Sequence, residues 1–265
     1  VMGISSNAIS PFIRMRYRVY ECVELGHERK LESFLEQDHV ILGDYGMPRV
    51  ARNHYCTNPS KPRYVHIDLS RTGDRCGIAM IRYDGMLDVN RSGNQMESLP
   101  QATVELACTI APDANNEIQI AEIRAWVRSL ITVHKYPIKG VSYDGFDSRE
   151  SIQQWRKDRM PSRELSVDRS AAPYKQLRDA LYDGRIALPD DPVLIGEILD
   201  LEYDSQADRI DHPVNGSKDC ADAVCGAFSS MLERRSTWHA IHESVNGDDL
   251  AGRVEDLDRY DEPRR

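Results

Sequence analysis

The order of the apolar runs restricts the fold of this chain more than any other feature of its sequence. Three runs typical of β-strands come first, and short breaker-rich segments separate them. They lie at 64–70, 76–85 and 101–112. An amphipathic helix is expected at 116–131, and helix-like and strand-like runs alternate after it. This order predicts a mixed α/β sheet in which an antiparallel set of strands is joined by parallel strands.

The second half of the chain supplies the remaining elements. Strands are expected at 138–146 and 163–170, and helices at 148–158, 171–184 and 217–235. Ser148 and Ser217 are candidate caps for two of these helices, and Gly184 is expected to end a third. The run 191–204 fits either a helix or a pair of strands. Strands in this order, with helices on both faces of the sheet, follow the chain order of a ribonuclease H-like fold.

The sequence predicts three parts. Residues 1–58 are expected to form a linker or extension with a short helix at 28–37, and the breaker-rich text TNPSKP ends this part. Residues 59–235 are expected to form the α/β domain, in which Asp84 and Gly85 would turn the chain after the second strand. Residues 236–265 are expected to be an acidic, flexible tail.

Several classes of protein are excluded by composition. No apolar run approaches the roughly 18 residues that a membrane-spanning helix needs. The N-terminal text has no charged head followed by a continuous apolar stretch, which favours a cytosolic protein. The six cysteines form no CxxC pair and have no nearby histidine to complete a zinc site, so we expect reduced thiols, most of them buried.

The distribution of charge qualifies the net charge of −9. From Glu243 onward, eight acids stand against four arginines, so the tail carries much of the negative excess. Two groups of basic residues gather elsewhere and could flank a phosphate backbone. They are Arg14, Arg16 and Arg18, and then Arg156, Lys157, Arg159, Arg163, Arg169, Lys175 and Arg178. Solvated helix faces are the alternative explanation for both groups.

Two aspartates mark expected strand ends. Asp68 lies within the otherwise apolar run YVHIDLS. A charged side chain in such a run is costly unless it is paired or bound to a metal. Asp144 ends the run VSYD, at the carboxyl edge of the sheet where ligands gather in open α/β folds. If these strands are neighbours, both carboxylates face one place. Each residue also has a structural explanation, because Asp68 could belong to a buried ion pair and Asp144 could form a turn.

A second acidic pair opens the last expected helix. Asp219 and Asp222 are three residues apart, so they share a face of the helix, and its dipole favours anions there. Complementing the helix dipole is an alternative role for both. Converging carboxylates are unstable unless cations bind them, and Mg²⁺ and Mn²⁺ prefer oxygen ligands. The four acids therefore predict a site for two divalent cations, the arrangement that hydrolyses phosphodiesters.

Other polar residues near these acids are weaker candidates. Lys218 could contact phosphate or steady the carboxylates, and His66 lies two positions before the strand aspartate, on the same face. Asp74 and Asp147 suit turns or caps, although either could reach a second metal through water. His212 precedes the last helix and could approach a substrate, but an exposed loop histidine is the simpler interpretation.

Three segments together resemble the nuclease domain of tailed-phage large terminases, the motors that package DNA into procapsids. The segments are HIDLSRTGDRCGIAMI, VSYDGFDSRESIQQW and GSKDCADAVCGA. The resemblance spans residues from about Tyr64 to Arg235. It implies that Asp68, Asp144, Asp219 and Asp222 bind the catalytic metals, with Asp222 favoured as the direct ligand of the last pair.

The resemblance also implies an activity and partners. A metal-dependent endonuclease of this kind cuts concatemeric viral DNA with two Mg²⁺ or Mn²⁺ ions, in the cytoplasm of the infected cell. Its partners would be double-stranded DNA, a terminase ATPase domain, the small terminase and the portal. No G-x-x-x-x-G-K-[ST] motif occurs here, so the ATPase is expected on a separate or longer chain. A structure-selective resolvase or transposase, or a non-catalytic DNA- or capsid-docking module, remains an alternative.

Overall fold

The computed structural model describes residues 9–44, 46–52, 54–69, 75–91, 95–115, 117–145 and 148–245, the side chains of 234–245 excepted. The chain divides into two compact units, residues 1–231 and residues 232–265. All the elements discussed below lie in the first unit, except the second half of the last helix.

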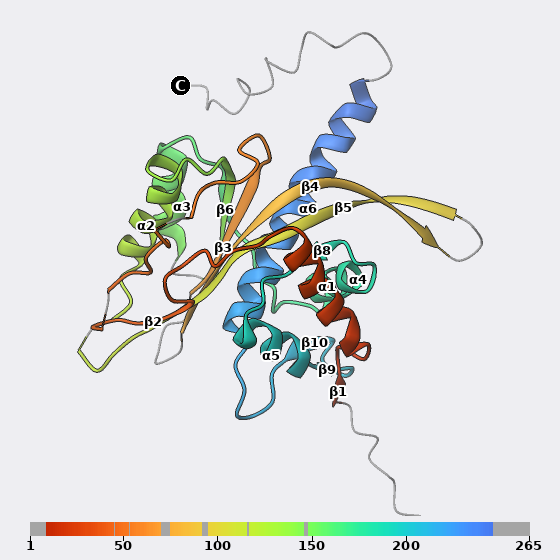
Figure 1. Cartoon of the computed structure of the whole chain (residues 1–265), viewed down its shortest axis with the longest axis horizontal. Coiled ribbons are helices and arrows are strands. Elements are labelled where there is room, and N and C mark those ends of the chain that lie inside the picture. Colours follow the sequence, from red (N-terminus) through yellow and green to blue (C-terminus); the bar gives the residue numbers. More distant parts are fainter. Residues whose placement is uncertain are drawn as a thin grey trace, which may run out of the picture. The chain divides into compact units, whose positions relative to one another are not determined.

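A seven-stranded mixed sheet forms the centre of the first unit (Figure 1). Its strands run in the order β2-β5-β4-β3-β6-β7, and β8 pairs with β5. Their bounds are β2 His39–Ile41, β3 Arg63–Asp68, β4 Cys76–Arg91, β5 Gln95–Ala111, β6 Ile138–Asp144, β7 Ser162–Glu164 and β8 Ile186–Ala187. The strands β3, β4 and β5 are antiparallel, whereas β6 and β7 run parallel to β3. The predicted ribonuclease H-like mixed sheet is therefore confirmed.

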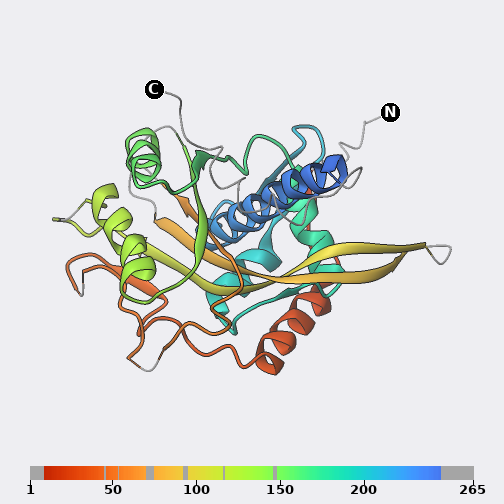
Figure 2. The same ribbon diagram turned by 90° about the horizontal axis from the view of Figure 1, so that it is seen from above.

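Helices cover both faces of this sheet (Figure 2). The helices are α1 Arg16–Glu28, α2 Ile120–Thr132, α3 Arg149–Lys157, α4 Ala172–Tyr182, α5 Pro192–Asp200 and α6 Asp219–Val245. The apolar faces of α2 and α3 pack on one face of the sheet, where Trp126 and Trp155 join a core with Ile67 and Val141. The first turns of α6 lie against β3 and β4, on the side of the sheet to which His66 points. This second face holds the acids discussed below.

A small second sheet involves the N-terminal segment. Its strands are β1 Ile9–Pro11, β9 Glu202–Asp204 and β10 Arg209–Asp211, in the order β1-β9-β10. The first helix, α1, contacts β8, α4 and α5. Leu188 donates its backbone N–H to the carbonyl of Cys22 at 2.9 Å, which fixes α1 beside β8. The division into a linker, a nuclease domain and an acidic tail stays a prediction.

The prediction of a helix at 28–37 is wrong. The helix of this region instead spans Arg16–Glu28, where Val19, Cys22, Val23 and Gly26 are buried at helical spacing. It ends because Lys30 adopts a left-handed backbone with φ of 55°, and Leu31 donates its N–H back to the carbonyl of Gly26.

The expected turn at Asp84 and Gly85 is also wrong. The strand β4 continues to Arg91, and the register shifts between Tyr83 and Gly85, so the pair forms a β-bulge. Gly85 has a φ of 128°, a backbone conformation that residues with a side chain rarely adopt. The Asp84 carboxylate turns inward, where it accepts hydrogen bonds from Arg29 at 2.5 Å and Arg82 at 2.6 Å. A buried charge network thus replaces the solvent-exposed turn.

Smaller expectations differ in detail. The strand at 163–170 is limited to Ser162–Glu164, and the open choice at 191–204 resolves into α5 followed by β9. Ser148 stands at the N-cap position of α3, but its hydroxyl donates to the carbonyl of Gly145 at 2.7 Å instead of capping the helix. Gly184, with a φ of 66°, follows α4 as expected.

The cysteines and the hydropathy of the helices are considered next, for the described residues. All six cysteines are free, and only Cys56 is not buried. Within the ranges given above, no helix has both the length and the apolar character needed to cross a bilayer.

Candidate metal centre

Asp68 and Asp144 end two adjacent parallel strands at the same level. They are paired residues in the register of β3 and β6, and each is the last residue of its strand. The preceding residues of both strands are almost all buried. The apolar residues therefore hold the strands in the core, and the two acids lie at the carboxyl edge of the sheet. The sheet therefore brings these two carboxylates side by side, as their positions in the sequence predict.

The helix α6 brings Asp219 and Asp222 to the same place. A side chain at Gly77 of β4 would lie 2.0 Å from the carbonyl oxygen of Asp219, so the first turn of α6 rests directly on the strand. Burial, and secondly the negative charges of Asp222, Asp144 and Asp219, raise the pKa of Asp68 to about 8. The four predicted acids therefore share one electrostatic environment.

Asp222 is the most enclosed of the helix acids. Its Oδ2 accepts a hydrogen bond from Lys218 Nζ at 2.7 Å, and its Oδ1 accepts one from the hydroxyl of Tyr174 on α4. Burial raises the pKa of Asp222 to about 7, although the Lys218 ammonium acts in the opposite direction. Both oxygens of this carboxylate thus already have protein donors.

Asp144 is held from the far side by the loop after β7. Ser166 Oγ donates to Asp144 Oδ2 at 3.2 Å. Burial raises the pKa of Asp144, and the charge of Asp168 raises it too. The loop therefore orients one carboxylate and contributes another beside it.

Asp168 is a member of this cluster that the sequence analysis missed. Its Oδ1 accepts a hydrogen bond from Lys218 Nζ at 2.6 Å, and 35% of its side chain is exposed. Lys218, only 7% exposed, thus bridges Asp168 and Asp222. The expected strand at 163–170 hid the signal. Because β7 ends at Glu164, Asp168 follows the end of a parallel strand, as Asp144 ends its own.

His66 supports the site from below. Its ring is fully buried, and its Nδ1 lies 2.8 Å from Ser142 Oγ on the neighbouring strand. A side chain at Gly226 of α6 would lie 2.3 Å from this ring, so the helix packs flush against it. Burial, and secondly the charge of Arg163, lower the pKa of His66 to about 3, so the ring is neutral. Its ring is enclosed in the core beside Ser142 and α6, and a role of His66 in supporting the acids stays a prediction.

Comparisons with known proteins give matches of fold and none of sequence family. Neither protein-family models nor curated protein sequences match the chain. Solved structures do match. The fold is similar to large terminase nucleases. The nuclease of the thermophilic phage G20c matches at 13% identity and a TM-score of 0.46, over 66% of this chain and 85% of that one.

Two further matches have the same character. The magnesium-bound form of the G20c nuclease also matches at 13% identity and a TM-score of 0.46, over 66% of this chain and 83% of that one. The large terminase of bacteriophage HK97 matches at 14% identity and a TM-score of 0.45, over 83% of this chain. The chain spans 43% of the HK97 protein. At such TM-scores we base the function of the site on its own geometry.

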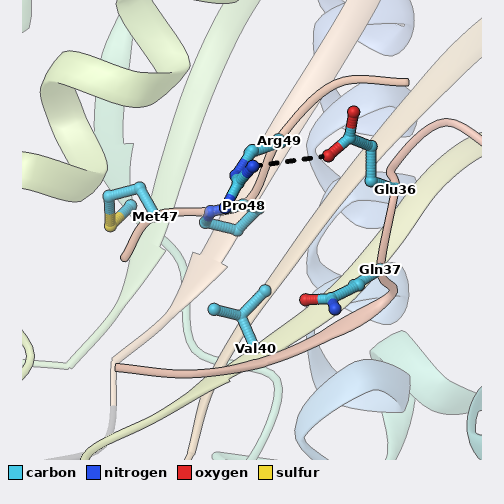
Figure 3. A pocket seen from close by; sticks show the side chains of 6 residues that line it. All are labelled: Glu36, Gln37, Val40, Met47, Pro48 and Arg49. Atoms are coloured by element: carbon cyan, nitrogen blue, oxygen red, sulfur yellow. Dashed lines mark ion pairs between the residues drawn. The ribbon is translucent and has the colours of Figure 1, made fainter. Parts of the chain in front are cut away.

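Three candidates from the sequence remain, Asp74, Asp147 and His212. Asp74 and Asp147 lie outside the described residues. His212 lies in the loop before α6, where its Nδ1 is 2.8 Å from the carbonyl oxygen of Pro213. A hollow elsewhere on the molecule is lined by none of the acids, and its Arg49 lies 3.8 Å from Glu36 (Figure 3).

The donor chemistry of the cluster fits a hard divalent cation. It offers carboxylate oxygens from two strand ends and one helix, without a thiol or an accessible imidazole, which suits Mg²⁺ or Mn²⁺. Within the described ranges, no three His, Cys, Asp or Glu side chains are gathered as a ready set of ligands. Asp222 turns its oxygens to Lys218 and Tyr174.

Proposed function

We propose that this chain is a metal-dependent endonuclease that cuts double-stranded DNA as the nuclease part of a phage genome-packaging terminase. One observation carries the proposal: Asp68 and Asp144 are paired at the ends of adjacent parallel strands, and α6 directs Asp222 and Asp219 toward them. Burial and mutual repulsion make these carboxylates unfavourable as free anions, and bound cations relieve both effects.

The residues of the cluster have distinct roles in this proposal. Asp68, Asp144 and Asp222 would hold the cations, and Asp219 would add charge or a water-mediated contact. When bound, two divalent cations supply a nucleophilic hydroxide and stabilise the leaving 3′ oxygen. Ser166 orients Asp144 through its hydrogen bond, and the buried face of α6 limits access of water to Asp222. Lys218 holds Asp222 in place and compensates its charge.

The substrate and partners follow from the terminase-like motifs. The substrate would be concatemeric viral DNA in the cytoplasm of the infected cell. The chain would act with a terminase ATPase domain, the small terminase and the portal. The acids at 68, 144, 219 and 222, which the motifs supply, are the ones that share one electrostatic environment, and this coincidence supports the proposal.

Nicking of supercoiled plasmid tests the activity. We expect the purified chain to nick plasmid with Mn²⁺, and we expect Asp68→Asn to lower the rate at least about 100-fold because a carboxylate that would hold a cation is lost. Asp200→Asn is the matched control, because Asp200 is an exposed acid of α5. Cleavage that persists in Asp68→Asn or in excess chelator would contradict the proposal.

A non-catalytic docking module is the second candidate, and one contact favours it. Lys218 and Tyr174 satisfy both oxygens of Asp222 without any metal, as they would if the acids served folding alone. Such a module would bind DNA or a capsid protein, would show no Mn²⁺-dependent nicking, and would tolerate Asp68→Asn without loss of binding. The plasmid experiment therefore separates the two candidates.

A further inference from the structure

The first turn of α6 is capped by a residue from another helix. The first N–H of α6 with a partner inside the helix region is that of Asp222, which donates to the carbonyl of Lys218 at 2.6 Å. The three preceding N–H groups need other acceptors. Glu197 Oε2 accepts from the N–H of Ala221 at 3.0 Å, and the carboxylate also bonds to the N–H of Cys220.

Glu197 makes one more contact at this helix start. Its Oε1 lies 2.8 Å from Ser217 Oγ, which also lies 2.8 Å from Asp219 Oδ2, so the one hydroxyl proton is shared between these two acceptors. The hydroxyl of Ser217 is thereby engaged, and it lies 3.5 Å from the N–H of Asp219, so it is a weak cap for its own helix. A buried carboxylate on α5, only 8% exposed, thus replaces the cap that the sequence predicts at Ser217.

The element that carries Glu197 is itself fixed. Asp191 caps α5 by accepting from the N–H groups of Val193 and Leu194, at 2.8 and 3.1 Å. Leu194 and Ile198 of α5 are fully buried. The carboxylate therefore acts from a rigid support.

On the sheet side, α6 has no freedom to approach further. The carbonyl of Asp219 rests on Gly77, and Gly226 rests on His66 two turns later. These contacts set the distance of the helix from the strands. Glu197, which bonds to two backbone N–H groups and to Ser217 just before the helix, holds the first turn at its place along the sheet.

We propose that Glu197 is the positioning residue of the metal centre, which places Asp219 and Asp222 opposite Asp68 by fixing the first turn of α6. The proposal rests on the proposed metal-dependent nuclease. Glu197 acts through the reach of its side chain, because both oxygens are needed at fixed places. Its charge is secondary, since an amide of the same length can accept from Ala221 and donate to Ser217 Oγ.

Two substitutions separate reach from charge. Glu197→Asp keeps the charge and shortens the side chain by one methylene, and Glu197→Gln keeps the length and removes the charge. We would titrate each folded protein with Mn²⁺ by calorimetry and then measure kcat and KM for plasmid nicking. Asp200→Asn on the exposed side of α5 is the control.

We expect Glu197→Asp to weaken Mn²⁺ binding about tenfold or more, the usual effect of removing a residue that orients ligands. Glu197→Gln should bind Mn²⁺ within about threefold of the wild type, and kcat should fall with KM unchanged only in the Asp variant. Equal Mn²⁺ affinity of the Asp variant and the wild type would overturn the proposal. So would a tenfold loss in a folded Gln variant, because it would show that charge acts instead of reach.

The outcomes also separate this proposal from the nuclease itself. If the wild type neither binds Mn²⁺ nor nicks plasmid, the proposed function fails. If the wild type does both and Glu197→Asp does so equally well, only the positioning role fails. Should Glu197→Asp be too unstable to titrate, Glu197→Ala takes its place, with the same expected tenfold loss of Mn²⁺ affinity, and wild-type affinity of this variant would overturn the proposal.

Discussion

Lys218, the residue directly before α6, donates its Nζ to Asp222 Oδ2 at 2.7 Å. The contact places a fixed positive charge inside a cluster of acids, where it also reaches Asp168 at 2.6 Å. In the metal-free protein, this lysine neutralises part of the negative charge that bound cations would neutralise. Loss of the ammonium and gain of a cation should therefore compensate each other.

Replacing this lysine tests the compensation. In Lys218→Met the charges of Asp168 and Asp222 lose their counter-ion, which should destabilise the metal-free protein by about 3–5 kcal/mol. Saturating Mn²⁺ should restore much of this stability, so the rise in melting temperature on adding Mn²⁺ should be larger in the variant than in the wild type. Lys175→Met, on the exposed face of α4, is the control. Equal Mn²⁺ shifts in all three proteins would contradict this account.

The pH dependence of stability should report on Asp68. Its pKa is about 8 in the folded protein against an ordinary 3.8, so between these values the folded state holds a proton that the unfolded chain has lost. Stability in the presence of chelator should therefore fall as pH rises from about 5 to 8, by up to about 1.4 kcal/mol per pH unit for one such proton. Urea unfolding measures it. The slope should be smaller in Asp68→Asn, and parallel slopes would show that Asp68 does not titrate in this way.

Metal binding should follow the opposite trend. The ligands must release protons before they bind a cation, so the affinity for Mn²⁺ should rise between about pH 6 and 8, in step with the pKa values of about 7 for Asp222 and about 8 for Asp68. Calorimetric titrations in buffers of different ionisation enthalpy would count the protons released. Binding that releases no proton over this range would rule out these two aspartates as ligands.

The four acids of the site can be predicted from residue spacing alone, but the residues that hold them in place cannot. Asp68 and Asp144 stand at the ends of apolar runs, and a parallel pair of such runs has only one way to align its ends. Glu197 and Tyr174 bond to α6 from 24 and 48 residues away, and no periodicity of the sequence records such contacts. Asp168 was hidden by a strand expected to be longer than it is.

The same limit explains the turn that became a bulge. An Asp followed by a Gly is a common sequence for a turn. Here the Asp84 carboxylate turns inward because Arg29 and Arg82 lie beside it in the folded chain. Long-range charge pairing therefore overrides local preference at this point. The combination of antiparallel and parallel strands, by contrast, depends on the order of the apolar runs, and this fold class was predicted correctly.

The contact between β4 and α6 predicts a sharp effect of a single methyl group. In Gly77→Ala the new Cβ would meet the carbonyl oxygen of Asp219 at 2.0 Å, so α6 must shift. We expect a loss of about 2 kcal/mol or more and a drop in nicking rate greater than the loss of folded protein explains. Gly196→Ala on α5 is the control. Its Cβ would meet no atom within 4 Å, so it should raise stability by up to about 1 kcal/mol. Nearly normal nicking by Gly77→Ala would contradict the account.

The shape of the DNA substrate distinguishes a packaging nuclease from a resolvase. A packaging nuclease should cut linear duplex and a four-way junction of equal length at similar rates, with cuts at many positions. A resolvase should prefer the junction by at least about tenfold, with cuts near the branch. Gel mapping of end-labelled substrates gives both the rate and the position. Symmetrical cuts confined to the branch would replace the terminase proposal with the resolvase alternative.

The most direct test of the metal centre is a crystal soaked in Mn²⁺ and measured at the manganese absorption edge. The account predicts two neighbouring anomalous peaks in contact with the carboxylates of Asp68, Asp144 and Asp222, with the Asp222 side chain turned away from Lys218. Peaks at other places, or no peak among these acids in a protein that nicks DNA with Mn²⁺, would contradict it.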